Sequence, residues 1–149
     1  MTEEIVMGTV RAEITLRNVA DEDKAEEGLI REDEVRSITV NAVVDTGAST
    51  VVINEELRQK LGLAKLEERR AKLADGNRVP CWRTDPVAIY WKNRRCVCEA
   101  LVVPDANKVL LGALPLEDMD LMIHPKTREL VGVHGDDVEY MALYNKGFR

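Results

Sequence analysis

A single acidic residue, Asp45, stands on a glycine-containing turn, residues 45–50, whose sequence is Asp-Thr-Gly-Ala-Ser-Thr. The preceding segment, residues 37–44, alternates between apolar and polar side chains, as is typical of a β-strand with one face toward solvent. A strand that ends in a lone carboxylate on a glycine turn suits catalysis. Because the chain contains one such element, a reaction that needs two opposed carboxylates must take the second from another copy of the chain.

The chemistry open to such a pair is hydrolysis of a peptide bond. Two carboxyl groups about 3 Å apart share one proton, because like charges at that distance cannot both ionise. The ionised group then accepts a proton from water while the protonated group polarises the substrate carbonyl. A glycine after the acid, Gly47, lets backbone N–H groups approach the carboxylate, and the hydroxyl of Thr46 can hold the turn against its partner.

Several short elements must position this turn. Alternation over 9–17 predicts a first strand, and 51–53 resumes extended structure after the turn. A short helix is expected over 55–61, with Asn54 as its N-cap and Gly62 at its end. The remaining predictions are strands at 86–91 and 94–103 around a turn at 92–93, an apolar run at 109–111 ended by Gly112, a helix at 115–119, and a hairpin of 121–123 with 129–131.

The Asp-Gly-Asn sequence at 75–77 is a strong hairpin signal because its residues tolerate positive φ angles. We expect this hairpin to be a mobile cover. Many short strands with two brief helices predict an all-β fold, mostly β with a closed, barrel-like sheet and one lobe per chain. An apolar strand, a glycine and a short helix occur at 45–61 and again at 110–119, which indicates a pseudo-twofold repeat within the domain.

Composition limits the other possibilities. A chain of 149 residues with 45% hydrophobic content fits one domain, 1–149, with an acidic loop insertion at about 20–36. The formal net charge is −6, and residues 21–36 carry eight acidic and three basic side chains, so most of the negative charge lies there. We interpret this segment as a solvated loop, with a tether for a basic partner as the alternative. The sequence has no basic face that would predict nucleic-acid binding.

The three cysteines are expected to be reduced thiols in a cytoplasmic protein. Cys96 and Cys98 share one side of a predicted strand, where neighbours are poorly placed for a disulfide. Zinc would need two more soft ligands, and Cys81, His124 and His134 are scattered, so we expect neither a metal nor a cofactor. The start of the chain lacks the pattern of a signal peptide, and no apolar run approaches the length of a membrane span, so no membrane partner is expected.

The sequence from Val43 to Ser49 resembles the active-site signature of retropepsin-like (clan AA) aspartic proteases, particularly the small single-domain prokaryotic members. The resemblance spans about residues 8–131. It rests on the order of elements: an apolar strand, Asp-Thr-Gly-Ala, a second strand, a short helix, the hairpin at 75–77, and the apolar-apolar-Gly element at 110–112 with its helix.

This resemblance implies a homodimer that cleaves a peptide or protein substrate, with one aspartate from each protomer at the dimer axis. Asp45 would be the catalytic carboxylate, Thr46 the hydroxyl that bonds between protomers, and Gly47 with Ala48 the loop on the substrate side. Asp75, Gly76 and Asn77 would form the tip of a flap over the substrate. The chain departs from the retroviral pattern in its long acidic insertion, its glycine-poor flap and its tail after residue 132.

Other interpretations remain open from the sequence. The same fold could serve as a non-catalytic dimeric module for peptide binding or assembly. It could also be a processing domain of a longer polyprotein, and Asp45 could simply satisfy a turn. Ser49 and Thr50 lack any local pattern that ties them to a histidine, so a serine triad is disfavoured.

Overall fold

The structure is a computed structural model that describes residues 9–136. The predictions for the first residues of the chain and for most of the tail after residue 132 lie outside these described residues. No helix within residues 9–136 is long and apolar enough to cross a membrane.

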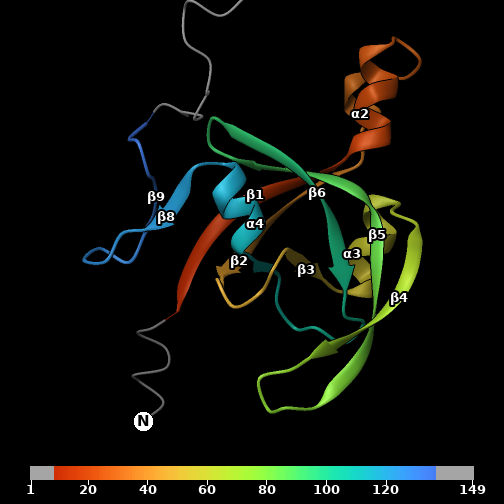
Figure 1. The fold of residues 1–149 in the computed structure, drawn as a ribbon. Helices are drawn as coiled ribbons and strands as arrows, with labels where there is room; N and C mark the ends of the chain where they lie inside the picture. Colours follow the sequence, from red (N-terminus) through yellow and green to blue (C-terminus); the bar gives the residue numbers. More distant parts are fainter. Residues whose placement is uncertain (1–8, 137–149) are drawn as a thin grey trace, which may run out of the picture.

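The fold is mostly β, as predicted. Seven strands pair in the order β1-β2-β7-β3-β6-β5-β4, and β1 also pairs with β5, so six of them close into a ring. A two-stranded sheet of β8 and β9 lies beside it (Figure 1). The strands are β1 (Val10–Asn18), β2 (Ser37–Val44), β3 (Val51–Ile53), β4 (Lys65–Lys72), β5 (Arg78–Trp91), β6 (Arg94–Val102), β7 (Leu110–Leu111), β8 (Leu121–Ile123) and β9 (Leu130–Gly132).

The helices are short: α2 (Val19–Glu26), α3 (Glu55–Leu61), α4 (Ala113–Asp118) and the 3-10 turn η1 (Glu32–Glu34). The predicted helix at 55–61 is confirmed with its caps. The side chain of Asn54 accepts from the Leu57 N–H at 2.9 Å, and Gly62 takes a φ of 68°. A left-handed residue at this position suits glycine, which has no Cβ to clash.

Alternation on β1 places every second side chain in the core, including Ile14 and Leu16. The last three residues of β2 are all buried, and at its end the strand is paired with β1 along one edge and with β7 along the other. Side chains from both halves of the ring fill its interior, which fixes the position of the turn that follows β2. The predicted hairpins at 75–77, 92–93 and 121–131 are all confirmed.

The prediction of a solvated acidic loop at 20–36 is wrong for its first part, where α2 forms. The side chain of Asn18 caps this helix by accepting from the Asp21 N–H at 2.9 Å. Asp21 itself is 4% exposed, and its carboxylate accepts from the backbone N–H, Nε and Nη2 of Arg36 at 3.0, 2.7 and 2.9 Å. This part of the charged run is therefore ordered by the Asn18 cap and by the ion pair between Asp21 and Arg36 at the other end of the run.

Strand β4 was also missed, because its side chains are exposed on both faces and show no apolar alternation. It pairs along its length with β5, and the two strands form a long hairpin. Figure 1 shows this hairpin extending from one end of the molecule and α2 projecting from the opposite end.

Candidate active site

Backbone hydrogen bonds hold the turn that carries Asp45. The Asp45 N–H donates to the carbonyl of Leu111 at 3.0 Å, and the Ala48 N–H donates to the Asp45 carbonyl at 3.0 Å. The Gly47 N–H donates to Asp45 Oδ1 at 2.9 Å, so the carboxylate is oriented by its own turn. A Cβ at position 47 would stand 3.1 Å from that oxygen, which explains the value of glycine there.

The second glycine element braces the first. Strand β7 lies between β2 and β3, pairing parallel with β2 and antiparallel with β3. After Gly112, the N–H groups of Ala113 and Leu114 donate to the carbonyls of Ala48 and Ser49 at 2.8 and 3.0 Å. The start of α4 therefore fixes the far side of the Asp45 turn, and the two parts of the predicted internal repeat meet here.

The turn presents its polar groups outward. Asp45 and Ala48 are half-buried, whereas Thr46 and Gly47 are exposed. Within residues 9–136, the hydroxyl of Thr46 has no hydrogen-bond partner. The turn is therefore held by β7 and α4 on one side and exposed on the other. The carboxylate of Asp45 and the hydroxyl of Thr46 can contact a molecule that docks on the exposed side.

The predicted flap residues form the tip of the β4–β5 hairpin. The Leu73 N–H donates to the Asn77 carbonyl at 2.7 Å, and the Gly76 N–H donates to the Leu73 carbonyl at 2.9 Å. Gly76 has a φ of 89°, and Asp75 Oδ1 accepts from the Asn77 N–H at 2.9 Å. All three tip residues are exposed, and no hydrogen bond in the described part of the chain joins this tip to the Asp45 turn.

Thr50 has a role that sequence reasoning missed. Its hydroxyl donates to the carbonyl of Glu99 on β6 at 2.8 Å, which anchors the end of the turn to the neighbouring strand. The side chain of Glu99 pairs with Arg83 on β5, and Arg83 also pairs with Glu67 on β4. The sequence carried no signal for this connection, because Thr50 lies in the turn, the other three residues lie on three different strands, and their relative positions follow from the register.

The two histidines contact backbone N–H groups and a carboxylate. Nδ1 of His124 accepts from the backbone N–H groups of Lys126 and Thr127 at 3.1 and 3.2 Å, and so completes a turn. His134 lies 2.9 Å from the carboxylate of Asp120. Across residues 9–136, no group of three or more His, Cys, Asp or Glu side chains is arranged to hold a metal ion.

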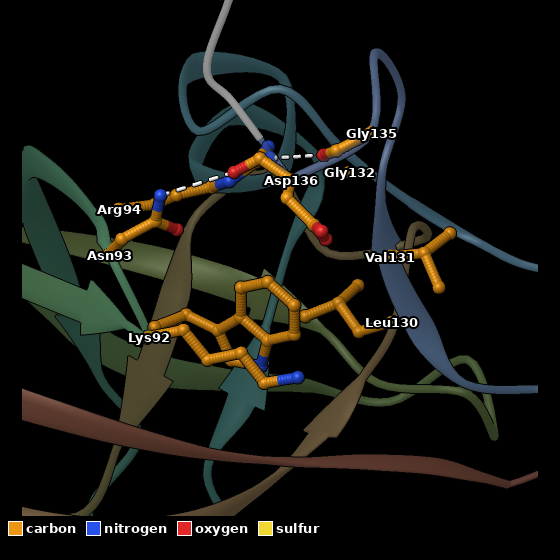
Figure 2. Close-up of a pocket in the computed structure, with 9 residues that line it drawn as sticks. Lys92, Asn93, Arg94, Leu130, Val131, Gly132, Gly135 and Asp136 are labelled. Carbon is orange, nitrogen blue, oxygen red and sulfur yellow. Dashed lines mark hydrogen bonds between the residues drawn. The ribbon is translucent and has the colours of Figure 1, made fainter.

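A pocket of about 390 Å³ lies between the β5–β6 turn on one side and β9 with the loop after it on the other (Figure 2). The buried side chain of Arg94 crosses its edge and donates to the Gly135 carbonyl at 2.5 Å, and Asn93 donates to the Asp136 carbonyl at 3.1 Å. Arg94 also donates to the carbonyls of Met119 and Asp120. These bonds to main-chain oxygens tie the loop after β9 and the end of α4 to the β5–β6 turn, which gives the surroundings of the pocket a structural role.

The chain was also compared with known proteins. A sequence model of the family described as "gag-polyprotein putative aspartyl protease" matches residues 34–118, more than half of the chain. The chain is similar to the solved structure of the EIAV protease complexed with the inhibitor HBY-793. This match has 28% identity over 54% of this chain and 76% of that chain, with a TM-score of 0.43. A search of curated proteins found no match. The chain thus belongs to this family of retropepsin-like aspartic proteases.

Proposed function

We propose that the protein is an aspartic endopeptidase that acts as a homodimer, with each copy supplying one lobe and one Asp45. The observation that carries the proposal is the Asp45 turn, which is braced from behind by β7 and α4 and exposes Thr46 and Gly47 in front. Two such turns meeting face to face would bring two carboxyl groups together, and such a pair shares one proton.

In this mechanism the paired carboxyl groups act on a water molecule and on the substrate carbonyl. The ionised Asp45 accepts a proton from water, and the protonated Asp45 of the other copy donates to the carbonyl oxygen of the scissile bond. The water attacks directly, so no covalent bond to the enzyme forms. The hydroxyl of Thr46 would bond across the dimer axis, Ala48 would contact the substrate, and residues 75–77 would cover an extended peptide.

The first test measures cleavage of an unfolded protein library by the full chain between about pH 4 and pH 7. Wild type should cleave and Asp45→Asn should not, because an amide cannot accept the proton from water. Asp105→Asn is the matched control, since Asp105 is exposed and lies outside the turn. Cleavage that survives Asp45→Asn would overturn the assignment of Asp45.

The second test asks whether two copies build one site. Inactive Asp45→Asn chains are mixed with wild type and allowed to exchange partners. If each site needs both carboxylates, an equal mixture has active pairs in about a quarter of its dimers when pairing is random. Activity should then fall as the square of the wild-type fraction. Activity that stays proportional to the amount of wild type would show that one chain suffices.

A dimeric peptide-binding module is the second candidate, and the β4–β5 hairpin favours it. The β4 arm carries charged side chains that are exposed along its length, and no hydrogen bond within residues 9–136 joins its tip to the Asp45 turn. Binding of a fluorescent peptide by wild type, without turnover over the same pH range, would support this function and contradict proteolysis.

A further inference from the structure

Strand β6 carries two thiols on one face, beside α4. Cys96 is 3% exposed, whereas Cys98 is partly exposed. The third cysteine of the chain, Cys81, lies on β5 and is 1% exposed. A pocket of about 470 Å³ between β6 and α4 is lined by both β6 thiols together with Leu114, Pro115, Glu117 and Asp118. Cys98 is therefore the thiol that a small molecule in this pocket can reach.

The surroundings of Cys98 favour its thiolate. Hydrogen bonds from the thiol of Cys96, the hydroxyl of Thr50 and the backbone N–H of Val51 lower the pKa of Cys98, against the opposing effects of burial and of the nearby charge on Asp118. The same pairing raises the pKa of Cys96. Cys98 is also the more exposed of the two sulfurs, so it is the one that an incoming disulfide meets. A thiolate is the nucleophilic form of cysteine.

The walls of this pocket are the elements that hold the Asp45 turn. Thr50 Oγ1 lies 3.5 Å from Cys98 Sγ and 2.8 Å from the Glu99 carbonyl, and its single proton serves one acceptor at a time. On the α4 side, the Ala113 N–H donates to the Ala48 carbonyl at 2.8 Å. A group placed between β6 and α4 would therefore disturb the two hydrogen bonds that hold the turn, from Thr50 to the Glu99 carbonyl and from Ala113 to the Ala48 carbonyl.

We propose that Cys98 is a site of reversible modification by small-molecule disulfides, and that the attached group loosens the Asp45 turn by separating α4 from β6. The Cys98 thiolate attacks one sulfur of the disulfide. A new S–S bond forms as the old one breaks, and the departing thiolate takes a proton from water. Addition of a small thiol reverses the step by the same exchange.

The charges at the pocket select among disulfides. Glu117 and Asp118 line the pocket, so an incoming cation is attracted and an anion repelled. Cystamine, a dication, should therefore react faster than glutathione disulfide, which is an anion. Replacing the acid at the rim by Glu117→Gln should reduce this preference without touching either thiol.

The test treats the full-length chain at neutral pH with cystamine or with glutathione disulfide, and follows the adducts by intact mass and peptide mapping. One adduct should form, at Cys98, at least about tenfold faster than at the buried cysteines. Cys98→Ser should remove it, and the matched control Cys81→Ser should keep it. Equal rates at all three cysteines, as in the chain unfolded by denaturant, would overturn the proposal, as would faster reaction of glutathione disulfide than of cystamine.

The link to the Asp45 turn has a readout that does not require proteolysis. Hydrogen exchange of the Ala113 and Leu114 amides should speed up in the cystamine adduct and return when a reducing thiol is added. Unchanged exchange in the adduct would overturn the link. The effect on cleavage rests on the proposed function: if the protein cleaves peptides, the adduct should slow wild type and leave Cys98→Ser unaffected. An inactive protein that still shows the adduct and the exchange change would contradict proteolysis alone.

Discussion

Gly112 packs against Ala48 so closely that a Cβ at position 112 would stand 2.5 Å from the Ala48 carbonyl oxygen. It would also overlap the carbonyl oxygen of Thr50. Both obstacles are backbone atoms of the segment that begins with Asp45, and both residues are held in place by hydrogen bonds. Neither can yield as a flexible side chain could, so the two halves of the internal repeat touch only because residue 112 has no side chain.

Gly112→Ala should therefore destabilise the fold by about 3 kcal/mol, at the upper end of overpacking penalties, because the turn or β7 must shift. Urea denaturation of both proteins checks this, with the change read from the midpoint at constant slope. Gly47→Ala is the comparison, since its Cβ would meet only a carboxylate oxygen at 3.1 Å. Equal stability of Gly112→Ala and wild type would contradict the close packing.

The hairpin tip offers a milder test. Gly76 has a φ of 89°, and a Cβ there would meet nothing within 4 Å, so substitution costs backbone strain alone. Gly76→Ala should cost about 1 kcal/mol in local stability, and Gly76→Asn less, because asparagine tolerates positive φ. The measurement is exchange of the Leu73 amide, which donates across the tip to Asn77. The reverse order of the two variants would show that strain is not the cause.

Asp21 predicts a pH dependence of stability. Hydrogen bonds from Arg36 lower the pKa of Asp21 below its ordinary value of 3.8. A carboxyl group whose pKa is lower in the folded state stabilises the fold above the unfolded pKa, and this contribution is lost as the pH falls through the folded value. Asp21→Asn should thus cost about 2 kcal/mol near neutral pH, since bonds to a buried charged group are lost.

This difference between Asp21→Asn and wild type should shrink as the pH falls below 3.8, because the unfolded chain takes up a proton at Asp21 there and the folded protein does so only at lower pH. Thermal or urea unfolding at a series of pH values measures it. Glu26→Gln, an exposed position on the same helix, serves as the control and should change little at any pH. A constant difference down to pH 2 would contradict the role of the carboxylate.

Arg94 is a buried cation whose guanidinium binds carbonyl oxygens from the end of α4, the next residue and the loop after β9, and lies 3.8 Å from the carboxylate of Asp120. Arg94→Leu should destabilise the protein by about 3 kcal/mol, because these acceptors lose their donor in the interior. The stability of Arg94→Lys should lie between those of wild type and Arg94→Leu, since one ammonium group cannot reach three carbonyl oxygens as a guanidinium does. Faster amide hydrogen exchange in β8 and β9 of Arg94→Leu would show where the structure is loosened. A variant Arg94→Leu as stable as wild type would contradict this role of Arg94.

Thr46 tests the proposed dimer separately from catalysis. Its side chain is exposed, so Thr46→Val should leave the unfolding free energy of the monomer unchanged. If its hydroxyl bonds across the axis, dimerisation should weaken roughly tenfold or more, because each hydrogen bond contributes about 1 kcal/mol. Sedimentation at several concentrations measures this, with Ser49→Ala as the matched variant in the same turn. Equal weakening by both variants would argue against a specific role for Thr46.

The sequence predicted the elements whose signals are local. Asn54 and Gly62 mark both ends of α3, and the Asp-Gly pair at 75–76 marks the hairpin tip. Strand β2 was predicted to its last residue because half-burial leaves a period of two over most of its length. The position of Asp45 followed from these elements, so the turn itself could be read in advance.

The missed features depend on contacts between distant residues. Helix α2 has no apolar stripe, and it is ordered partly by Glu22, whose carboxylate binds Arg17, Tyr90 and Arg95. Strand β4 exists because β5 offers a partner, whatever its own pattern. The close approach of residue 112 to the turn likewise depends on the placement of β7 between two other strands, which no window of sequence contains.

Closure of the ring has a consequence for behaviour at high concentration. Because β1 pairs with both β2 and β5, β4 is the one strand of the seven-stranded sheet, within residues 9–136, that has a neighbouring strand on one side only. Unpaired edges invite neighbouring molecules to add strands, and exposed charges oppose this. Six of the eight residues of β4 are charged, of both signs. The charged side chains of β4 leave it without apolar alternation, which is why the sequence did not predict this strand. The same charges oppose edge-to-edge aggregation.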